Sequence, residues 1–203
     1  MKHMELCHTI YRRSLRESDP QAIREIVKST GYFSDEEIEV AVELASEGLH
    51  RGNKSSYQFM FAEVSERLIA YTCFGRIPGT LYSYDLYWIV VHEDFRGLGI
   101  GRALLKQTEE TISGLGGCYV YIETSSRSLY EPTRQFYVRC GYTQTAVLEN
   151  FYAPGDSKIT YRKVLKRGGY VQNTENLRLH CAREPESSCS GAGDSSSPVP
   201  GPL

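Results

Sequence analysis

The chain has 203 residues, of which 40% are hydrophobic, and this is enough for one compact core. Its 23 basic and 25 acidic side chains give a formal net charge of -2 at pH 7, so it lacks the basic excess typical of nucleic-acid-binding proteins. No apolar run approaches the roughly 20 residues of a membrane span, the first residues lack a signal-peptide apolar region, and the 6 cysteines include no C-x-x-C pair; we therefore expect a cytoplasmic protein with neither a metal site nor a disulfide framework.

The N-terminal quarter predicts one strand followed by two helices. Residues 9–15 form the expected strand, and Ser18 with Pro20 is typical of the start of a helix. Ser34 and Glu37 have the spacing of a capping box, which opens a second helix. The apolar positions of this second helix recur on one face: Ile38, Val42, Ala45 and Leu49.

The central part of the chain predicts three strands, a helix and a fourth strand. Residues 57–64 and 68–74 are two strands joined by a turn, and residues 82–91 form a longer apolar strand. A period of two along this longer strand predicts that one set of side chains shares a face: Ser83, Asp85, Tyr87, Ile89 and Val91. A helix over residues 101–112 and a strand over residues 118–124 follow.

The C-terminal part predicts a helix over residues 131–140 and a hairpin made of residues 143–151 and 159–165. The order of the elements predicts an α/β (α+β) domain over residues 1–166, with a mixed central sheet of about six to seven strands and flanking helices. We expect residues 167–203 to form a disordered tail, because their composition offers too little apolar surface to offset the entropy of ordering.

A glycine-rich turn joins the long central strand to the helix that follows it. Residues 96–102 read Arg-Gly-Leu-Gly-Ile-Gly-Arg. Glycine lets successive backbone N–H groups converge without interference from Cβ atoms, and these amides lie at the positive end of a helix dipole. The turn therefore predicts a phosphate-binding site, to which Arg96 and Arg102 add full positive charges.

The spacing of the glycines identifies the kind of phosphate site. It is G-x-G-x-G, which differs from the G-x-G-x-x-G of dinucleotide-binding proteins, and no P-loop Gly-Lys-Ser/Thr follows. The pattern Arg-Gly-x-Gly-x-Gly between a strand and a helix resembles the pyrophosphate loop of the GNAT superfamily, the acyl-CoA N-acyltransferases. The resemblance implies a single GNAT-like domain that takes acetyl-CoA as co-substrate. It implies cofactor contacts from the whole turn: Arg96, Gly97, Leu98, Gly99, Ile100, Gly101 and Arg102.

A second motif coincides with the helix over residues 131–140. Residues 130–142 resemble the fourth-helix segment of the family, and Tyr137 lies at the position that the family uses as general acid toward the CoA sulfur. A tyrosine with a pKa of about 10 can protonate a thiolate as its charge develops, although Phe136 and Tyr137 can also simply pack the helix. The family often has an asparagine seven residues before this tyrosine; Tyr130 stands there instead and is a candidate cofactor contact.

The resemblance also implies a role for the backbone of the long central strand. In the family this strand splays from its neighbour, and the peptide-like arm of the cofactor pairs with the freed backbone groups. The matching residues here are Ile89, Val90 and Val91. We expect the Ile89 amide to face the thioester carbonyl as an oxyanion donor.

Two carboxylates interrupt otherwise apolar central strands, and both are candidate catalytic residues. A carboxylate at the position of Asp85 or Glu123 is costly unless it is paired or functional. Either one can serve as general base, directly or through water, or bind the ammonium group of the substrate. The alternative is a structural salt bridge with a base such as Arg76 or Arg127.

Acyl transfer to an amine needs no activated serine or cysteine when the amine attacks the thioester directly. The expected acceptor is a primary amine of a small molecule or an amino acid, beside the aromatic residues of the central strands. The loop over residues 32–36 and the hairpin tip over residues 151–156 are expected near it. A protein N-terminus or lysine as acceptor, a non-catalytic acyl-CoA-binding domain, and assembly as a homodimer stay open as alternatives.

Overall fold

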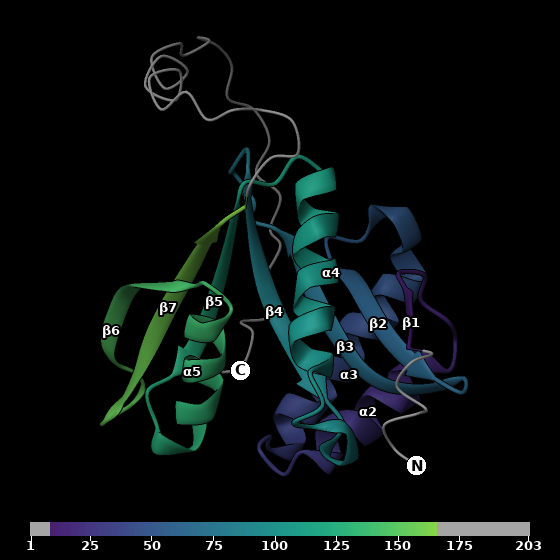
Figure 1. Cartoon of the computed structure of the whole chain (residues 1–203), viewed down its shortest axis with the longest axis horizontal. Coiled ribbons are helices and arrows are strands. Elements are labelled where there is room, and N and C mark those ends of the chain that lie inside the picture. The colour runs from purple at the N-terminus through teal and green to yellow at the C-terminus, as the bar shows by residue number, and fades with distance from the viewer. Residues whose placement is uncertain (1–8, 166–203) are drawn as a thin grey trace, which may run out of the picture.

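The computed structural model describes residues 9–165, and Figure 1 shows how their strands and helices are arranged. The tail expected over residues 167–203 lies outside the described residues. The strands are β1 (Ile10–Arg12), β2 (Gln58–Val64), β3 (Arg67–Arg76), β4 (Ser83–Val91), β5 (Tyr119–Ser125), β6 (Thr143–Ala153) and β7 (Asp156–Val164). The α-helices are α2 (Asp19–Ser29), α3 (Asp35–Arg51), α4 (Ile100–Gly114) and α5 (Glu131–Arg139), and three short 3-10 turns are η2 (Gly52–Lys54), η3 (Glu93–Phe95) and η4 (Ser128–Tyr130).

The strands form one seven-stranded sheet in the order β1-β2-β3-β4-β5-β7-β6. Strands β4 and β5 run parallel, and the other neighbouring strands run antiparallel. Helices α2 and α3 pack on one face of the sheet, and α4 and α5 pack on the other (Figure 1). The predicted α/β class and the mixed sheet are therefore confirmed. In the part of the chain described here, no helix is long and apolar enough to cross a membrane.

The two expected helix starts are both present, but only one is capped as predicted. At α3, the Glu37 amide donates to the Ser34 hydroxyl at 3.2 Å and the Ser34 amide donates to the Glu37 carboxylate at 2.8 Å, which is the predicted capping box. At α2, Ser18 makes no capping hydrogen bond. The carboxylate of Asp19 instead accepts from the Arg16 amide at 2.7 Å, so the residue after the expected cap holds the chain at this end.

The burial of α3 and β2 differs in detail from the sequence patterns. The buried residues of α3 are Ile38, Ala41, Leu44, Ala45 and Gly48, whereas Val42 and Leu49 are only half-buried. Strand β2 is buried on both faces because it lies between α4 and the α2–α3 pair, so it is not the half-exposed strand that an alternating pattern indicates.

Strand β4 contains a bulge that changes which side chains share a face. Cys73 of β3 pairs with Trp88, but the next residue, Phe74, pairs with Leu86. Tyr87 is therefore an extra residue on β4. Leu86 packs in the core with α4, whereas Tyr87 and Trp88 both pack against the α2–α3 side.

This bulge divides the set of residues that the period of two assigned to one face. Ser83, Asp85 and Tyr87 face the α2–α3 side of the sheet, while Ile89 and Val91 pack against the core on the α4 side. The single-face prediction is therefore wrong. Its physical reason is that one unpaired residue shifts the phase of every side chain that follows it along the strand.

Candidate active site

The glycine-rich turn has the backbone conformation that its sequence predicts. Strand β4 ends at Val91, η3 follows, and the chain then passes through Gly97 at φ +74° and Gly99 at φ +83° before α4 begins. Gly99 is the N-cap of α4 and supplies no side-chain oxygen, so the first amides of the helix stay available. A Cβ built on Gly97 or Gly99 meets no heavy atom within 4 Å, so the space on the Cβ side of these two residues is open.

The residues between the glycines anchor the turn to the core. Leu98 packs partly, and Ile100 almost completely, against the cluster that includes α4. Gly101 differs from the other two glycines, because a Cβ there would touch Val91 at 3.5 Å and Phe136 at 3.7 Å. The alternation thus directs the apolar side chains of the turn into the core.

The two arginines that flank the turn are held by different elements. The Arg96 guanidinium lies 4.8 Å from the centroid of the Tyr32 ring and its Nε is 3.4 Å from the Val91 carbonyl oxygen. Arg102 donates to the carbonyl oxygen of Arg139 at 3.2 Å, at the C-terminal end of α5. Arg96 therefore lies beside the end of β4 and the loop before α3, whereas Arg102 joins α4 to α5.

Strands β4 and β5 separate soon after they begin to pair. Their parallel register covers three residue pairs, Ser83 to Asp85 with Tyr119 to Tyr121, although both strands continue further (Figure 1). The His92 amide donates to the Ile69 carbonyl of β3 at 2.8 Å. Because alternate residues of a strand direct their backbone groups to opposite edges, those of Ile89 and Val91 point to the edge that β5 has left.

The same strand geometry gives the direction of the backbone groups of Val90, the third expected cofactor contact on β4. The backbone groups of Val90 face β3, with Tyr71 as the paired residue, so Val90 is on the closed side of the strand. The freed edge belongs to its two neighbours. The backbone groups that the separation of the strands frees on β4 therefore come from alternate, not consecutive, residues.

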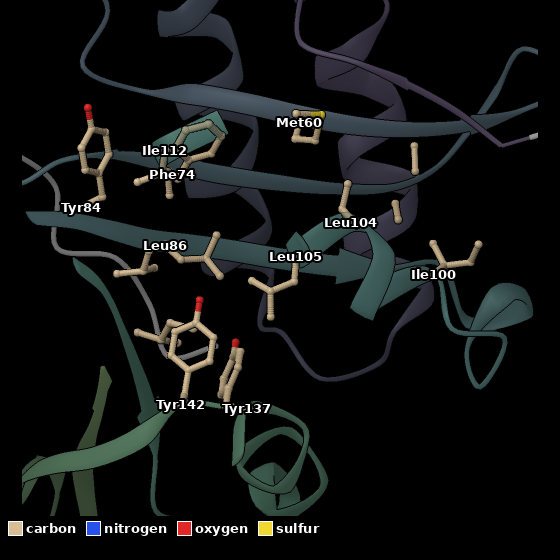
Figure 2. Close-up of a cluster of buried hydrophobic side chains, with 14 of the residues drawn as sticks. Met60, Phe74, Tyr84, Leu86, Ile100, Leu104, Leu105, Ile112, Tyr137 and Tyr142 are labelled. Atoms are coloured by element: carbon tan, nitrogen blue, oxygen red, sulfur yellow. The ribbon is translucent and has the colours of Figure 1, made fainter. Parts of the chain in front are cut away.

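Tyr137 of α5 is completely buried. Its ring packs among those of Phe136, Tyr142 and Tyr161 at centroid distances of 5.5 to 6.0 Å, and burial raises the pKa of its hydroxyl. Figure 2 shows its hydroxyl and that of Tyr142 directed toward β4. The Tyr142 hydroxyl donates to Glu109 at 2.9 Å, whereas the Tyr137 hydroxyl has no hydrogen-bond partner among residues 9–165.

Buried hydroxyl groups in native proteins usually form hydrogen bonds, so the Tyr137 hydroxyl has a free capacity to donate one. The Tyr130 hydroxyl is in the same condition, and its ring lies 6.4 Å from that of Tyr32 and 5.3 Å from the Arg127 guanidinium. Burial raises the pKa of Tyr130 as well. Tyr130 and Arg96 thus both contact Tyr32, which connects the glycine turn to the start of α5.

The two candidate carboxylates lie on the same face of the sheet, the one that carries α2 and α3. Asp85 pairs in register with Tyr121, and Glu123 is the next residue of β5 on that face. Glu123 forms a salt bridge with Lys158 of β7, with 3.0 Å between the Lys158 Nζ and Glu123 Oε1 atoms. For Glu123 the structure thus shows the alternative of a salt bridge, with Lys158 as the base.

Asp85 has a different environment from Glu123. The pKa of Asp85 is raised from 3.8 to about 6, mainly by burial and then by the charge of Glu123, against the charge of Lys158, which lowers it. No side chain or amide in the described range forms a hydrogen bond or ion pair with the Asp85 carboxylate. Asp85 is therefore the unpaired carboxylate of the two, and its pKa is near the range in which a carboxylate can exchange protons at neutral pH.

Aromatic side chains lie near Asp85 and Glu123, whose side of the sheet we call the acidic face. Tyr87 contacts Tyr57 edge to face at 5.5 Å between ring centroids, and burial followed by the charge of Asp85 raises the pKa of Tyr87. The pKa of Tyr152 is raised by burial and by Glu123, which places this hairpin residue near the same carboxylate. No motif in the sequence predicts Lys158 as a site residue; its one signal is its alternation along β7 with the inward-facing Ile159.

Comparisons with known proteins agree with this geometry. Residues 55–144 match the family model described as "Acetyltransferase (GNAT) domain". An uncharacterised N-acetyltransferase of Methanocaldococcus jannaschii is 31% identical over 102 residues, which are 50% of this chain and 62% of that protein, so the chain spans less than two thirds of this relative. The expectation drawn from the glycine turn and the Tyr137 segment concerned this same family.

Solved structures give a broader match. A crystal structure assigned to the GNAT family, from Desulfovibrio desulfuricans, is 40% identical, with 78% of this chain and 99% of that chain covered and a TM-score of 0.77. An aminoglycoside 6'-N-acetyltransferase solved in complex with coenzyme A is 18% identical, with 79% and 99% covered and a TM-score of 0.63. The second likeness concerns the fold alone. The chain belongs to the GNAT family of acetyltransferases.

Proposed function

We propose that the protein transfers the acetyl group of acetyl-CoA to a primary amine of a small molecule or an amino acid, by direct attack of the amine on the thioester. The observation that carries the proposal is the separation of β4 and β5 directly after Asp85. In this proposal the donor reaches the separation of the strands from the face that carries the glycine turn and α4, and the acceptor reaches it from the face that carries the unpaired carboxylate. Donor and acceptor can therefore approach from opposite sides of the sheet.

The residues on the donor side fit a coenzyme A thioester. The open amides of the turn at Gly97 and Gly99 suit a pyrophosphate, and the free β4 edge at Ile89 and Val91 suits a peptide-like arm. Bound acetyl-CoA supplies an activated carbonyl carbon and a thiolate leaving group. In this proposal the Ile89 amide stabilises the oxyanion, because this amide points away from β3 and into the gap.

Two proton transfers complete the proposed reaction. The attacking amine must lose a proton, and Asp85 accepts it, directly or through water, because its carboxylate is unpaired and its pKa of about 6 makes it a usable base near neutral pH. The departing thiolate must gain a proton, and Tyr137 donates it from a hydroxyl that has no partner in the described chain. Glu123 is assigned a supporting role, since Lys158 already neutralises it.

The test is a panel of amines mixed with purified protein and acetyl-CoA, with release of the CoA thiol and the mass of the product measured together. The panel contains amino acids, alkylamines, polyamines, aminoglycosides and short peptides. Thiol release with a small amine or amino acid, and acetylation of its nitrogen, is the expected result. Release with peptides alone would assign the acceptor to a protein N-terminus or lysine. Coenzyme A binding with no release from any amine would identify a non-catalytic domain and contradict the proposal.

A further inference from the structure

Lys158 lies inside the acidic face instead of at its rim. It pairs with Ser125 across the β5–β7 ladder, so its side chain shares the face of Ser125 and of Glu123 two residues earlier. Its Nζ is 3.0 Å from the Glu123 Oε1 atom. The Lys158 side chain is 15% exposed and that of Glu123 is 41% exposed, so the cation is the more enclosed partner.

A second contact fixes the position of this ammonium group. Lys158 Nζ lies 4.1 Å from the centroid of the Phe151 ring, over its face. A cation over an aromatic face is attracted to the ring, and the same ammonium group also pairs with the Glu123 carboxylate. The protein thus places its own ammonium group in an environment that would otherwise suit the ammonium group of a ligand.

The charges of the face determine what it can accept. Lys158 neutralises Glu123 in their salt bridge, whereas the Asp85 carboxylate has no ion-pair partner in the described chain. We propose that Lys158 is the specificity-determining residue of the acceptor site: it occupies the second cation position, so that the site favours acceptors whose reacting amine is their only cationic group. This inference rests on the proposed acetyl transfer to a small amine or amino acid.

The positions of Asp85, Glu123 and Lys158 predict which acceptor amines the site favours. A monocationic acceptor neutralises Asp85 when its ammonium group enters. The second ammonium group of a diamine finds Glu123 already paired and is repelled by Lys158. The repulsion between two positive charges several ångströms apart in a partly buried site is large enough to change the relative affinity for the two kinds of acceptor on the order of tenfold. Amino acids and monoamines are therefore the favoured class, and polyamines and aminoglycosides are disfavoured.

The test compares pentylamine with 1,5-diaminopentane, which differ by one ammonium group on chains of equal length. We expect Lys158→Met, which keeps the length and apolar stem of the side chain, to increase the preference for the diamine roughly tenfold in kcat/KM, with the effect weakened by added salt. Lys158→Arg keeps the charge and should keep the wild-type ratio. Lys106→Met is the matched control, since Lys106 lies on α4 in an exposed pair with Glu110 at 3.6 Å.

Calorimetric titration of both amines into the CoA-bound protein measures the same preference without turnover. An unchanged ratio in Lys158→Met, in turnover or in binding, would overturn the inference, as would an equal change in Lys106→Met. If the wild-type protein binds the amines with the expected preference but releases no thiol, the proposed acetyl transfer fails while the role of Lys158 stands. Circular dichroism melting confirms that each variant is folded before the ratios are compared.

Discussion

The substitution Asp85→Asn tests the acceptor side of the site through stability and activity together. The neutral amide has nearly the shape of the carboxyl group but carries no charge and cannot accept a proton from the amine. We expect it to stabilise the fold at alkaline pH and to decrease kcat by about 10²- to 10³-fold. A substitution that increases stability and abolishes activity is characteristic of a residue whose burial serves a function.

The magnitude follows from the pKa of Asp85. The pKa is raised from 3.8 to about 6, and each unit corresponds to about 1.4 kcal/mol, so ionised Asp85 costs the fold at most roughly 3 kcal/mol. Because the side chain keeps some contact with solvent, we discount this to about 1 to 2 kcal/mol. Below the unfolded-state pKa the carboxyl group is neutral in both states and the cost is absent. The cost appears as pH rises toward the folded-state pKa and is complete above it.

Urea unfolding at about pH 3 and about pH 8 measures this difference. The stability of Asp85→Asn should match that of wild type at the lower pH and exceed it at the higher pH. Glu123→Gln is the control, because it removes the partner of Lys158 and should not stabilise the protein at either pH. A gain that does not depend on pH, or full activity of Asp85→Asn, would refute the assignment of Asp85 as an unpaired, desolvated base.

Three further substitutions separate the other parts of the structure. Tyr137→Phe should decrease kcat by about 10²-fold. It should leave acetyl-CoA affinity and melting temperature near wild type, because the hydroxyl that it removes has no partner in residues 9–165. Full turnover across the pH range would exclude Tyr137 as the acid. Gly99→Ala should weaken coenzyme A binding at least about tenfold in calorimetry, since the new Cβ enters the open space beside the turn. Gly155→Ala is the control, because Gly155 has the same φ of +83° in the hairpin turn. It should show the same strain of about 1 to 2 kcal/mol without the loss of binding. Glu63→Gln should decrease the free energy of unfolding in urea by about 2 to 3 kcal/mol, because buried Glu63 accepts from Arg12 at 2.7 Å. Turnover at saturating substrate should be retained. A stability equal to wild type would show that this buried pair contributes nothing.

The helix starts and the glycine turn are features that the sequence alone determined, because their causes are local. Ser34 and Glu37 are three residues apart, and the capping box forms from their own hydrogen bonds. Gly97 and Gly99 adopt positive φ values that other residues rarely adopt, so the turn before α4 could be predicted from residue types. The family could be recognised for the same reason, since its fingerprint lies within one strand, turn and helix.

The acceptor face was decided by tertiary structure. The bulge at Tyr87 depends on how β3 and β4 pair, and it moved Ile89 and Val91 away from the face of Asp85. Glu123 is paired and Asp85 is unpaired because of Lys158, which the fold brings beside Glu123 from the neighbouring strand β7. Pairing register and burial arise between segments distant in sequence, so the periodicity of a single strand does not encode them. The residue types of this site could be predicted from the sequence, whereas their partners and pKa values were fixed only when the sheet assembled.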